Sequence, residues 1–163
     1  MVGQVYPISK TDDFAALARF FDAYGYGSFL TPSGDDLWSQ TAKTSGFMAK
    51  QIVQDNHIAA ALLWRQAADE AEIIEIAVMD QYRRQGFGRA LLADFIADLG
   101  ADLASQNSKR IILEVAENNK AAIALYAAFG FMTVGKRVNY YKAGQLRDGR
   151  VKKIDALILE LWL

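Results

Sequence analysis

Cysteine is absent from this chain of 163 residues, and histidine occurs once, as His57. The absence of cysteine excludes disulfides, a cysteine nucleophile, iron–sulfur clusters and thiolate zinc sites. A single histidine excludes a metal site built from several histidines, and the residues around His57 predict an exposed turn. We therefore expect a protein without a bound metal.

Long apolar runs are also missing, since none approaches the ~18 residues that a membrane span needs. The first residues lack the charged and apolar regions of a signal peptide. The sequence therefore predicts a cytoplasmic protein with no membrane partner.

Charge is nearly balanced over the whole chain, with a formal net charge of −1. This balance argues against a general nucleic-acid binder. The two halves differ, because residues 1–80 carry 5 bases and 11 acids (−6), whereas residues 81–163 carry 13 bases and 8 acids (+5). An anionic ligand is therefore expected on the second half.

Apolar periodicity predicts alternating strands and helices in one domain over residues 1–163. The expected strands are 5–8, 47–54, 58–66, 71–79, 110–116, 131–141 and 154–163. The expected helices are 11–21, 31–42, 91–103 and 119–129, and a basic loop over 142–153 joins the last two strands. This order indicates a three-layer α/β domain with a mixed sheet.

A glycine loop with three arginines, Arg83-Arg84-Gln85-Gly86-Phe87-Gly88-Arg89, lies between an expected strand and an expected helix. The start of a helix offers backbone N–H groups and partial positive charge, and arginine adds forked donors that suit phosphate. The segment is therefore a candidate pyrophosphate site; the alternative is an ordinary helix start with solvated arginines. It fits neither the GxxxxGK[ST] nor the GxGxxG phosphate loop.

Two blocks of sequence resemble the GNAT superfamily of N-acetyltransferases. Arg83-x-x-Gly86-x-Gly88 after Ile76-Ala77-Val78 resembles its acetyl-CoA motif, and residues 119–131 resemble a second block. The resemblance covers about residues 71–141, and within the superfamily the chain most resembles the RimI-like family of ribosomal protein alanine N-acetyltransferases. The stretches between Arg89 and Glu114 and between Tyr141 and Asp155 are longer than in that family.

The resemblance implies a mostly antiparallel mixed sheet of about seven strands, splayed between the fourth and fifth, with about four helices. It also implies that acetyl-CoA lies with its pantetheine arm on the fourth strand and its pyrophosphate on the glycine loop. The cofactor-binding residues it implies are Ile76, Ala77, Val78, Arg83, Arg84, Gln85, Gly86, Phe87, Gly88, Arg89 and Asn119.

Four side chains are candidates for the chemistry. Glu114 is a charge within an apolar strand, so it must be paired, solvated or altered in pKa, and the resemblance implies a general base. Tyr126 has the spacing of a core residue, and the resemblance implies that it protonates the departing thiolate. The backbone N–H of Val78 is the implied oxyanion donor. Tyr140 and Tyr141 are implied substrate contacts, of which a regular strand would send only one to the substrate.

The function implied is transfer of acetyl from acetyl-CoA directly to a primary amine. The first choice of acceptor is the N-terminal α-amine of a protein, such as a ribosomal protein that begins with alanine. A small-molecule amine, an antibiotic or a lysine are alternative acceptors, and a CoA-binding module without catalysis is a different class of function. A monomer or a homodimer is expected.

Overall fold

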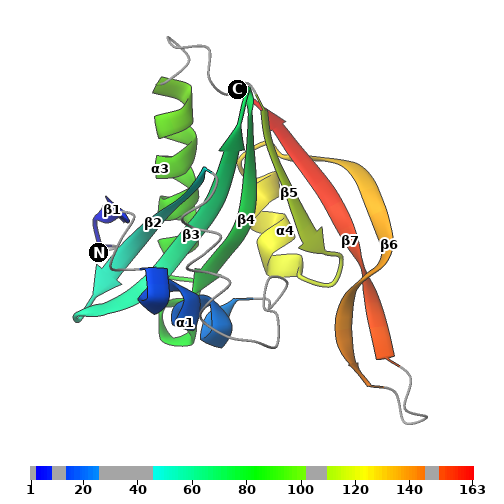
Figure 1. Ribbon diagram of the computed structural model, residues 1–163, viewed down its shortest axis with the longest axis horizontal. Coiled ribbons are helices and arrows are strands. Elements are labelled where there is room, and N and C mark those ends of the chain that lie inside the picture. The colour runs from blue at the N-terminus through cyan, green and yellow to red at the C-terminus, as the bar shows by residue number, and fades with distance from the viewer. Residues whose placement is uncertain (1–2, 9–13, 26–45, 102–109, 146–150) are drawn as a thin grey trace. The chain divides into compact units, whose positions relative to one another are not determined.

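The computed structural model describes residues 3–8, 14–25, 46–101, 110–145 and 151–163 (Figure 1). Contacts divide the chain into two compact units, Met1–Lys109 and Arg110–Leu163. Each unit has its own strands and helices. The single domain over residues 1–163 stays a prediction, as does the splay between the fourth and fifth strands.

Four antiparallel strands form the sheet of the first unit in the order β1-β2-β3-β4. They are β1 (Val5–Pro7), β2 (Phe47–Gln54), β3 (His57–Ala67) and β4 (Glu70–Val78). The bounds of β2 agree with the sequence, and those of the other three differ from expectation by one residue at one or both ends. Alternating and continuous apolar patterns therefore located these strands well.

The β2–β3 hairpin turns at Asp55 and Asn56, whose φ angles are 51° and 62°. A two-residue hairpin of this kind needs positive φ at both central positions, which aspartate and asparagine tolerate better than most residues. His57 follows the turn and is exposed, as the sequence predicted.

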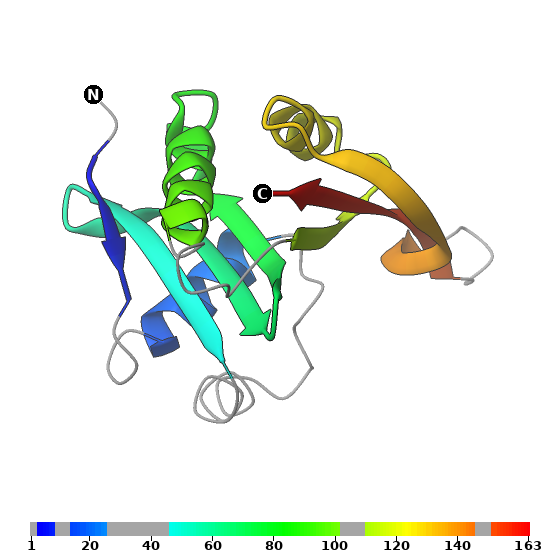
Figure 2. The same cartoon turned by 90° about the horizontal axis from the view of Figure 1, so that it is seen from above.

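Helices α1 (Phe14–Tyr24) and α3 (Phe87–Ala101) cover opposite faces of this sheet (Figure 2). The central strand β3 explains why both faces need cover, because all six residues from Ala59 to Trp64 are buried. Leu63 packs in one cluster with Phe21 of α1. Trp64 points the other way, and its ring lies 5.0 Å from that of Phe95 on α3. The alternation of side chains along β3 thus builds three layers.

A buried lysine also attaches α3 to the sheet. Lys50 of β2 is 6% exposed, and its ammonium pairs with the carboxylates of Asp94 and Asp98 on α3. Because a charge that leaves water must be paired, the two aspartates make the burial of Lys50 possible.

The second unit is a three-stranded antiparallel sheet with one helix, and its strand order is β5-β7-β6. Its elements are β5 (Arg110–Ala116), α4 (Lys120–Ala127), β6 (Met132–Gln145) and β7 (Val151–Trp162). The side chain of Asn119 caps α4 by accepting a hydrogen bond from the N–H of Ala122 at 3.2 Å. Gly130, with a φ of 88°, ends the turn that follows the helix. Asparagine at the start of a helix and glycine just after its end are the residue types that favour these two positions.

One expectation about the last hairpin is wrong. The basic segment 142–153 was expected to be a loop, but the strand ladder continues into it, with Lys142 opposite Lys153 and Gln145 opposite Val151. Backbone hydrogen bonds between neighbouring strands do not require apolar side chains, so polarity alone did not mark the end of these strands. The expected helix over 31–42 lies outside the described residues. Among the residues described, no helix is both long and apolar enough to cross a membrane.

We expect Phe95→Ala to lower the free energy of unfolding by about 3–5 kcal/mol, because it removes a fully buried ring that packs on Trp64 and leaves a cavity in its place. Urea denaturation measures this loss. The control is Ala97→Ser at an exposed position of the same helix, which should change stability by less than about 0.5 kcal/mol. Equal effects of the two substitutions would contradict the placement of α3 on β3.

Candidate active site

The glycine loop of the first unit is fixed by its own side chains. Arg83 folds back, so that its Nε donates to the carbonyl of Val78 at 3.1 Å and its terminal nitrogen pairs with Asp80 at 2.9 Å. Asp80 belongs to the 3₁₀ helix η1 (Asp80–Tyr82). Gln85 donates to the carbonyl of Gln81 at 2.6 Å. Two of the predicted cofactor residues, Arg83 and Gln85, therefore hold the loop together.

The loop leads directly into the first turn of helix α3. Gly86 has a φ of 91°, which a residue without Cβ adopts at little cost, and its carbonyl accepts the first helical bond from Ala90 at 2.9 Å. The N–H groups of Phe87 and Gly88 stand ahead of that bond, where a helix has no internal acceptor for them. The Arg84 and Arg89 side chains are exposed beside them. The side chain of Phe87 is instead buried, with its ring 5.2 Å from that of Tyr82.

Strand β4 ends beside this loop and offers backbone groups. Ala77 is buried in the core, whereas Ile76 and Val78 are half-buried. The N–H of Met79 donates to Ala59 of β3 at 2.9 Å. Because N–H groups alternate in direction along an antiparallel strand, the N–H of Val78 points away from β3, toward the edge where its carbonyl meets Arg83.

In the second unit, Glu114 lies on β5 between two buried residues, Leu113 and Val115. Its side chain is 21% exposed, and its Oε1 is 2.7 Å from the Nε of Arg137 on β6. The predicted need for a partner is therefore met by an arginine that the sequence analysis did not identify. Tyr126 of α4 is 4% exposed, and its ring lies 5.5 Å from that of Phe131.

Tyr140 and Tyr141 do not point to opposite faces, so that expectation is wrong. Their rings meet edge to face with centroids 5.0 Å apart. The strand is irregular here, since Asn139 has a φ of 57° and the register between β6 and β7 shifts between Arg137 and Tyr141. We call residues 138–140 the bulge. A bulge breaks the period of two on which the expectation depended.

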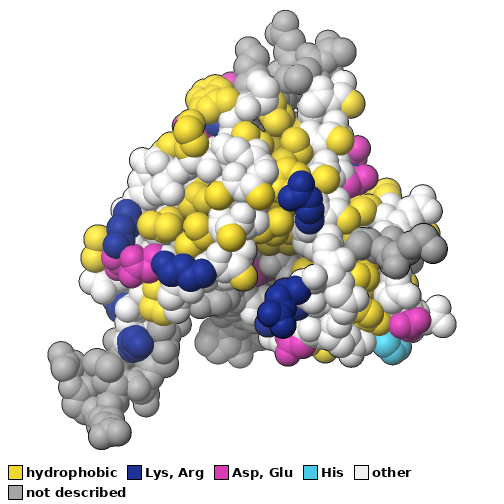
Figure 3. Space-filling view, turned by 180° about the vertical axis from the view of Figure 1, so that it is seen from behind, with side chains coloured by type: hydrophobic (Ala, Val, Ile, Leu, Met, Phe, Trp, Pro, Cys, Tyr) yellow, Lys and Arg dark blue, Asp and Glu magenta, His cyan; other side chains and the backbone are white. Residues whose placement is uncertain are grey.

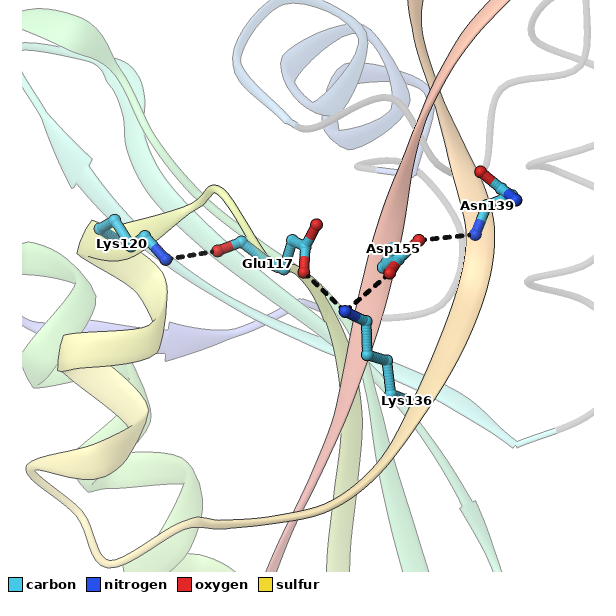
Figure 4. A network of polar contacts seen from close by, with 5 residues as sticks. All are labelled: Glu117, Lys120, Lys136, Asn139 and Asp155. Atoms are coloured by element: carbon cyan, nitrogen blue, oxygen red, sulfur yellow. Dashed lines mark hydrogen bonds and ion pairs between the residues drawn. The ribbon is translucent and has the colours of Figure 1, made fainter.

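A network of charges holds the bulge (Figure 4). The N–H of Asn139 donates to the carboxylate of Asp155 on β7 at 2.8 Å. The other oxygen of Asp155 is 2.7 Å from the ammonium of Lys136, which also contacts Glu117 at 2.9 Å. Lys120 donates to the carbonyl of Glu117 at 2.9 Å and so ties the first turn of α4 to this network.

These contacts shift two pKa values, each in the direction that favours the charged form of the group. The hydrogen bond from Asn139, followed by that from Lys136, lowers the pKa of Asp155 from its ordinary value of 3.8. Hydrogen bonds to Asp155 and then to Glu117 raise the pKa of Lys136 from its ordinary value of 10.5. Folding therefore favours the charged form of both groups.

Sequence reasoning assigned no role to Arg137, Lys136 or Asp155. The alternation of side chains along a strand was a usable signal for Lys136 and Arg137, because it sends neighbouring residues to opposite faces. Their partners, however, come from β5 and β7, and no local pattern gives that register. In the face shown in Figure 3, basic side chains form small separate groups, several of them beside acidic ones. Within the described ranges, no three metal-ligating side chains converge.

The family model of the acetyltransferase (GNAT) family matches residues 14–131. This chain belongs to that family. It is 37% identical over 128 residues to the ribosomal protein bS18-alanine N-acetyltransferase of Escherichia coli (strain K12). The matched segment covers 76% of this chain and 80% of the relative. These matches confirm the resemblance on which the sequence analysis drew, and they establish an acetyl-CoA-dependent N-acetyltransferase.

Solved structures agree with this fold. The crystal structure of the ribosomal-protein-S18-alanine N-acetyltransferase from Escherichia coli has a TM-score of 0.73 at 31% identity and covers 98% of this chain and 92% of that one. Arabidopsis thaliana NAA60 in complex with acetyl-CoA has a TM-score of 0.76 at 13% identity, with 98% of both chains covered. The expected GNAT fold is thus confirmed, with seven strands and three α-helices in the part of the chain that the structure describes.

The contribution of Asp155 to stability should depend on pH. Because folding lowers its pKa, this contribution is present above the ordinary value of 3.8 and is lost as the pH falls through the lower pKa of the folded chain. We therefore expect Asp155→Asn to destabilise the protein at about pH 6 and to make the fall in melting temperature between about pH 6 and pH 3 less steep.

Thermal melting at a series of pH values measures this difference. Asp69→Asn, at an exposed position in the turn between β3 and β4, is the matched control and should leave the slope unchanged. Parallel curves for the wild type and Asp155→Asn would show that the hydrogen bond to the bulge contributes nothing.

Proposed function

We propose that this enzyme acetylates the N-terminal α-amine of a protein, and that a ribosomal protein beginning with alanine is its acceptor. The observation that carries the proposal is the similarity to the Escherichia coli enzyme of that name over 76% of the chain, joined to a half-buried carboxylate at Glu114. Such an acceptor requires a cytoplasmic enzyme, as the sequence predicted.

The residues of the first unit fit the anionic part of acetyl-CoA. We assign the pyrophosphate to the N–H groups of Phe87 and Gly88 and to the Arg84 and Arg89 side chains, because a helix start and arginines suit phosphate. The role assigned to Arg83 is different, since its contacts hold the loop against the end of β4.

Further assignments concern the rest of the cofactor. Backbone groups at Ile76 and Val78 are assigned to the pantetheine arm, at the edge of β4 that faces away from β3. Asn119 already uses its carbonyl oxygen to cap α4, so only its amide nitrogen is assigned to the cofactor.

The chemistry needs a neutral amine, a stabilised oxyanion and a protonated leaving group. Acetyl-CoA supplies the activated acetyl group as a thioester. Glu114 is assigned to accept the proton of the amine, and Tyr126 to donate a proton to the departing sulfur. The N–H of Val78 is assigned to the oxyanion, because it is directed away from β3. With no cysteine in the sequence, an acyl group cannot be held on a cysteine, so direct transfer is the proposed route.

The tyrosines of β6 are assigned to the acceptor peptide. Tyr140 is 47% exposed and carries its ring against that of Tyr141. Two rings in contact form one surface, so both tyrosines can meet the same acceptor, contrary to what a regular strand would allow.

Acetyl-CoA should stabilise the protein, by about 2.7 kcal/mol at about 100 times its dissociation constant. We expect a clear rise in melting temperature with acetyl-CoA and a much smaller one with ATP or NAD. Gly88→Asp should remove the rise, because it adds a side chain and a negative charge at the helix start. Ala93→Asp adds the same charge at an exposed position beyond the first turn and should keep the rise. A larger shift with ATP than with acetyl-CoA would contradict the assignment of the loop.

A short peptide that begins with alanine should be acetylated on its N-terminus well ahead of spermidine, an aminoglycoside or an internal lysine. At about pH 7.5, roughly a quarter to two-fifths of a peptide α-amine is neutral, against about 0.1% of a lysine side chain, so one carboxylate suffices as its base. Mass spectrometry of mixed acceptors measures the preference.

The same assay tests the assigned residues. Glu114→Gln and Tyr126→Phe should each lower turnover by about 10²–10⁴-fold and leave acetyl-CoA binding within about twofold. Preferred acetylation of another amine would refute the acceptor, and variants that keep more than about half of the rate would refute the assigned roles.

A further inference from the structure

Arg137 connects the proposed base to the proposed peptide surface. Its Nε pairs with Oε1 of Glu114 at 2.7 Å, and its guanidinium carbon lies 5.4 Å from the centre of the Tyr140 ring. The Arg137 side chain is 56% exposed, so it is not needed to fill the core. In the described part of the chain, Oε2 of Glu114 has no ion-pair or hydrogen-bond partner. One oxygen is thus held while the other stays available.

The strand register explains how Arg137 reaches a residue two strands away. Arg137 on β6 lies opposite Ala156 of β7, and Glu114 on β5 lies opposite Ile158. Residues two apart share a face, so all four side chains belong to one face of the sheet. Ala156 is fully buried and carries only a methyl group there. Its small size leaves the space through which the guanidinium crosses the central strand.

Contacts on the opposite face of the sheet hold the backbone on both sides of Arg137. The preceding residue, Lys136, pairs with Glu117 and Asp155, and Asp155 holds the N–H of Asn139. Arg137 therefore lies between Lys136, whose side chain is held by two ion pairs, and the bulge, whose backbone is held by Asp155. The bulge in turn carries the Tyr140 ring onto its guanidinium, where the ring face attracts the cation.

We infer that Arg137 is a positioning residue for Glu114, an assignment that rests on the proposed function. The carboxylate of a glutamate on a strand turns about three side-chain bonds, and a misplaced base loses rate even when it is present. The ion pair through Nε limits these rotations and leaves Oε2 for the proton of the acceptor amine. Arg137 acts through Glu114, and it is expected to affect turnover rather than acetyl-CoA binding.

A double-mutant cycle tests this inference with the wild type, Arg137→Gln, Glu114→Gln and the double variant. We expect Arg137→Gln to lower kcat for the alanine peptide by about tenfold or more, with the KM for the peptide and the Kd for acetyl-CoA within about twofold. In the Glu114→Gln background the same substitution should change kcat by less than about twofold, because the group it positions is gone. Arg137→Lys should recover part of the lost rate, since an ammonium can still pair with Glu114.

Arg110 provides a closely matched control at the other end of the same sheet. It pairs with Glu160 at 3.5 Å and lies over the Trp162 ring at 5.6 Å, the same two kinds of contact that Arg137 makes. Arg110→Gln should leave kcat within about twofold of the wild type. A similar loss of kcat in both arginine variants would mean a general effect on the sheet and would overturn the inference.

The remaining outcomes separate the two proposals. If Glu114→Gln is slow but Arg137→Gln lowers kcat equally in both backgrounds, or changes only the KM for the peptide, Arg137 does not act through Glu114 and only this inference fails. If the alanine peptide is not acetylated, or Glu114→Gln keeps the wild-type rate, the proposed function fails and this inference fails with it.

Discussion

The hydrogen bond from the Asn139 N–H to the Asp155 carboxylate is the contact on which the second unit depends. At that point three residues of β6, the bulge, stand opposite one residue of β7, so the ladder cannot satisfy every backbone group. A carboxylate that accepts the Asn139 N–H replaces the missing backbone partner with a protein group and so fixes the bulge on β7, although residues 138–140 are exposed. The ammonium of Lys136 then keeps that carboxylate ionised and in place.

The bulge changes the directions in which the side chains of β6 point. Before it, Lys136 and Arg137 alternate as strand residues do and distribute their charges between two faces of the sheet. After it, Tyr140 and Tyr141 lie side by side. The paired rings therefore result from the bulge, whereas the ion pair with Glu114 follows from the regular register before it, and Asp155, which holds the bulge, lies on the face that Arg137 does not use.

Much of this fold could be predicted from the sequence because its signals are local. Strand β2, the turn at Asp55 and Asn56, and the cap at Asn119 each follow from neighbouring residues, and the structure has all three. The errors occur where the structure depends on contacts between residues that are far apart in the sequence. The length of the last hairpin depends on pairing between Gln145 and Val151, and the direction of the two tyrosines depends on Asp155, which is remote in sequence.

The same distinction applies to the residues assigned in each unit. The cradle assigned to acetyl-CoA consists mainly of backbone groups at a strand end and a helix start, so a local glycine pattern between a strand and a helix makes it a candidate from sequence alone. The residues assigned to the acceptor act through side chains, and an ion pair across β7 and a bulge held from the opposite face set the positions of those side chains. A sequence motif can therefore indicate the reaction, whereas the positions of the residues assigned to the acceptor depend on the pairing of β5, β6 and β7. Ala156 and Asp155 lie outside the acetyl-CoA motif, so substitutions there should displace Arg137 or the two tyrosines while the motif stays intact.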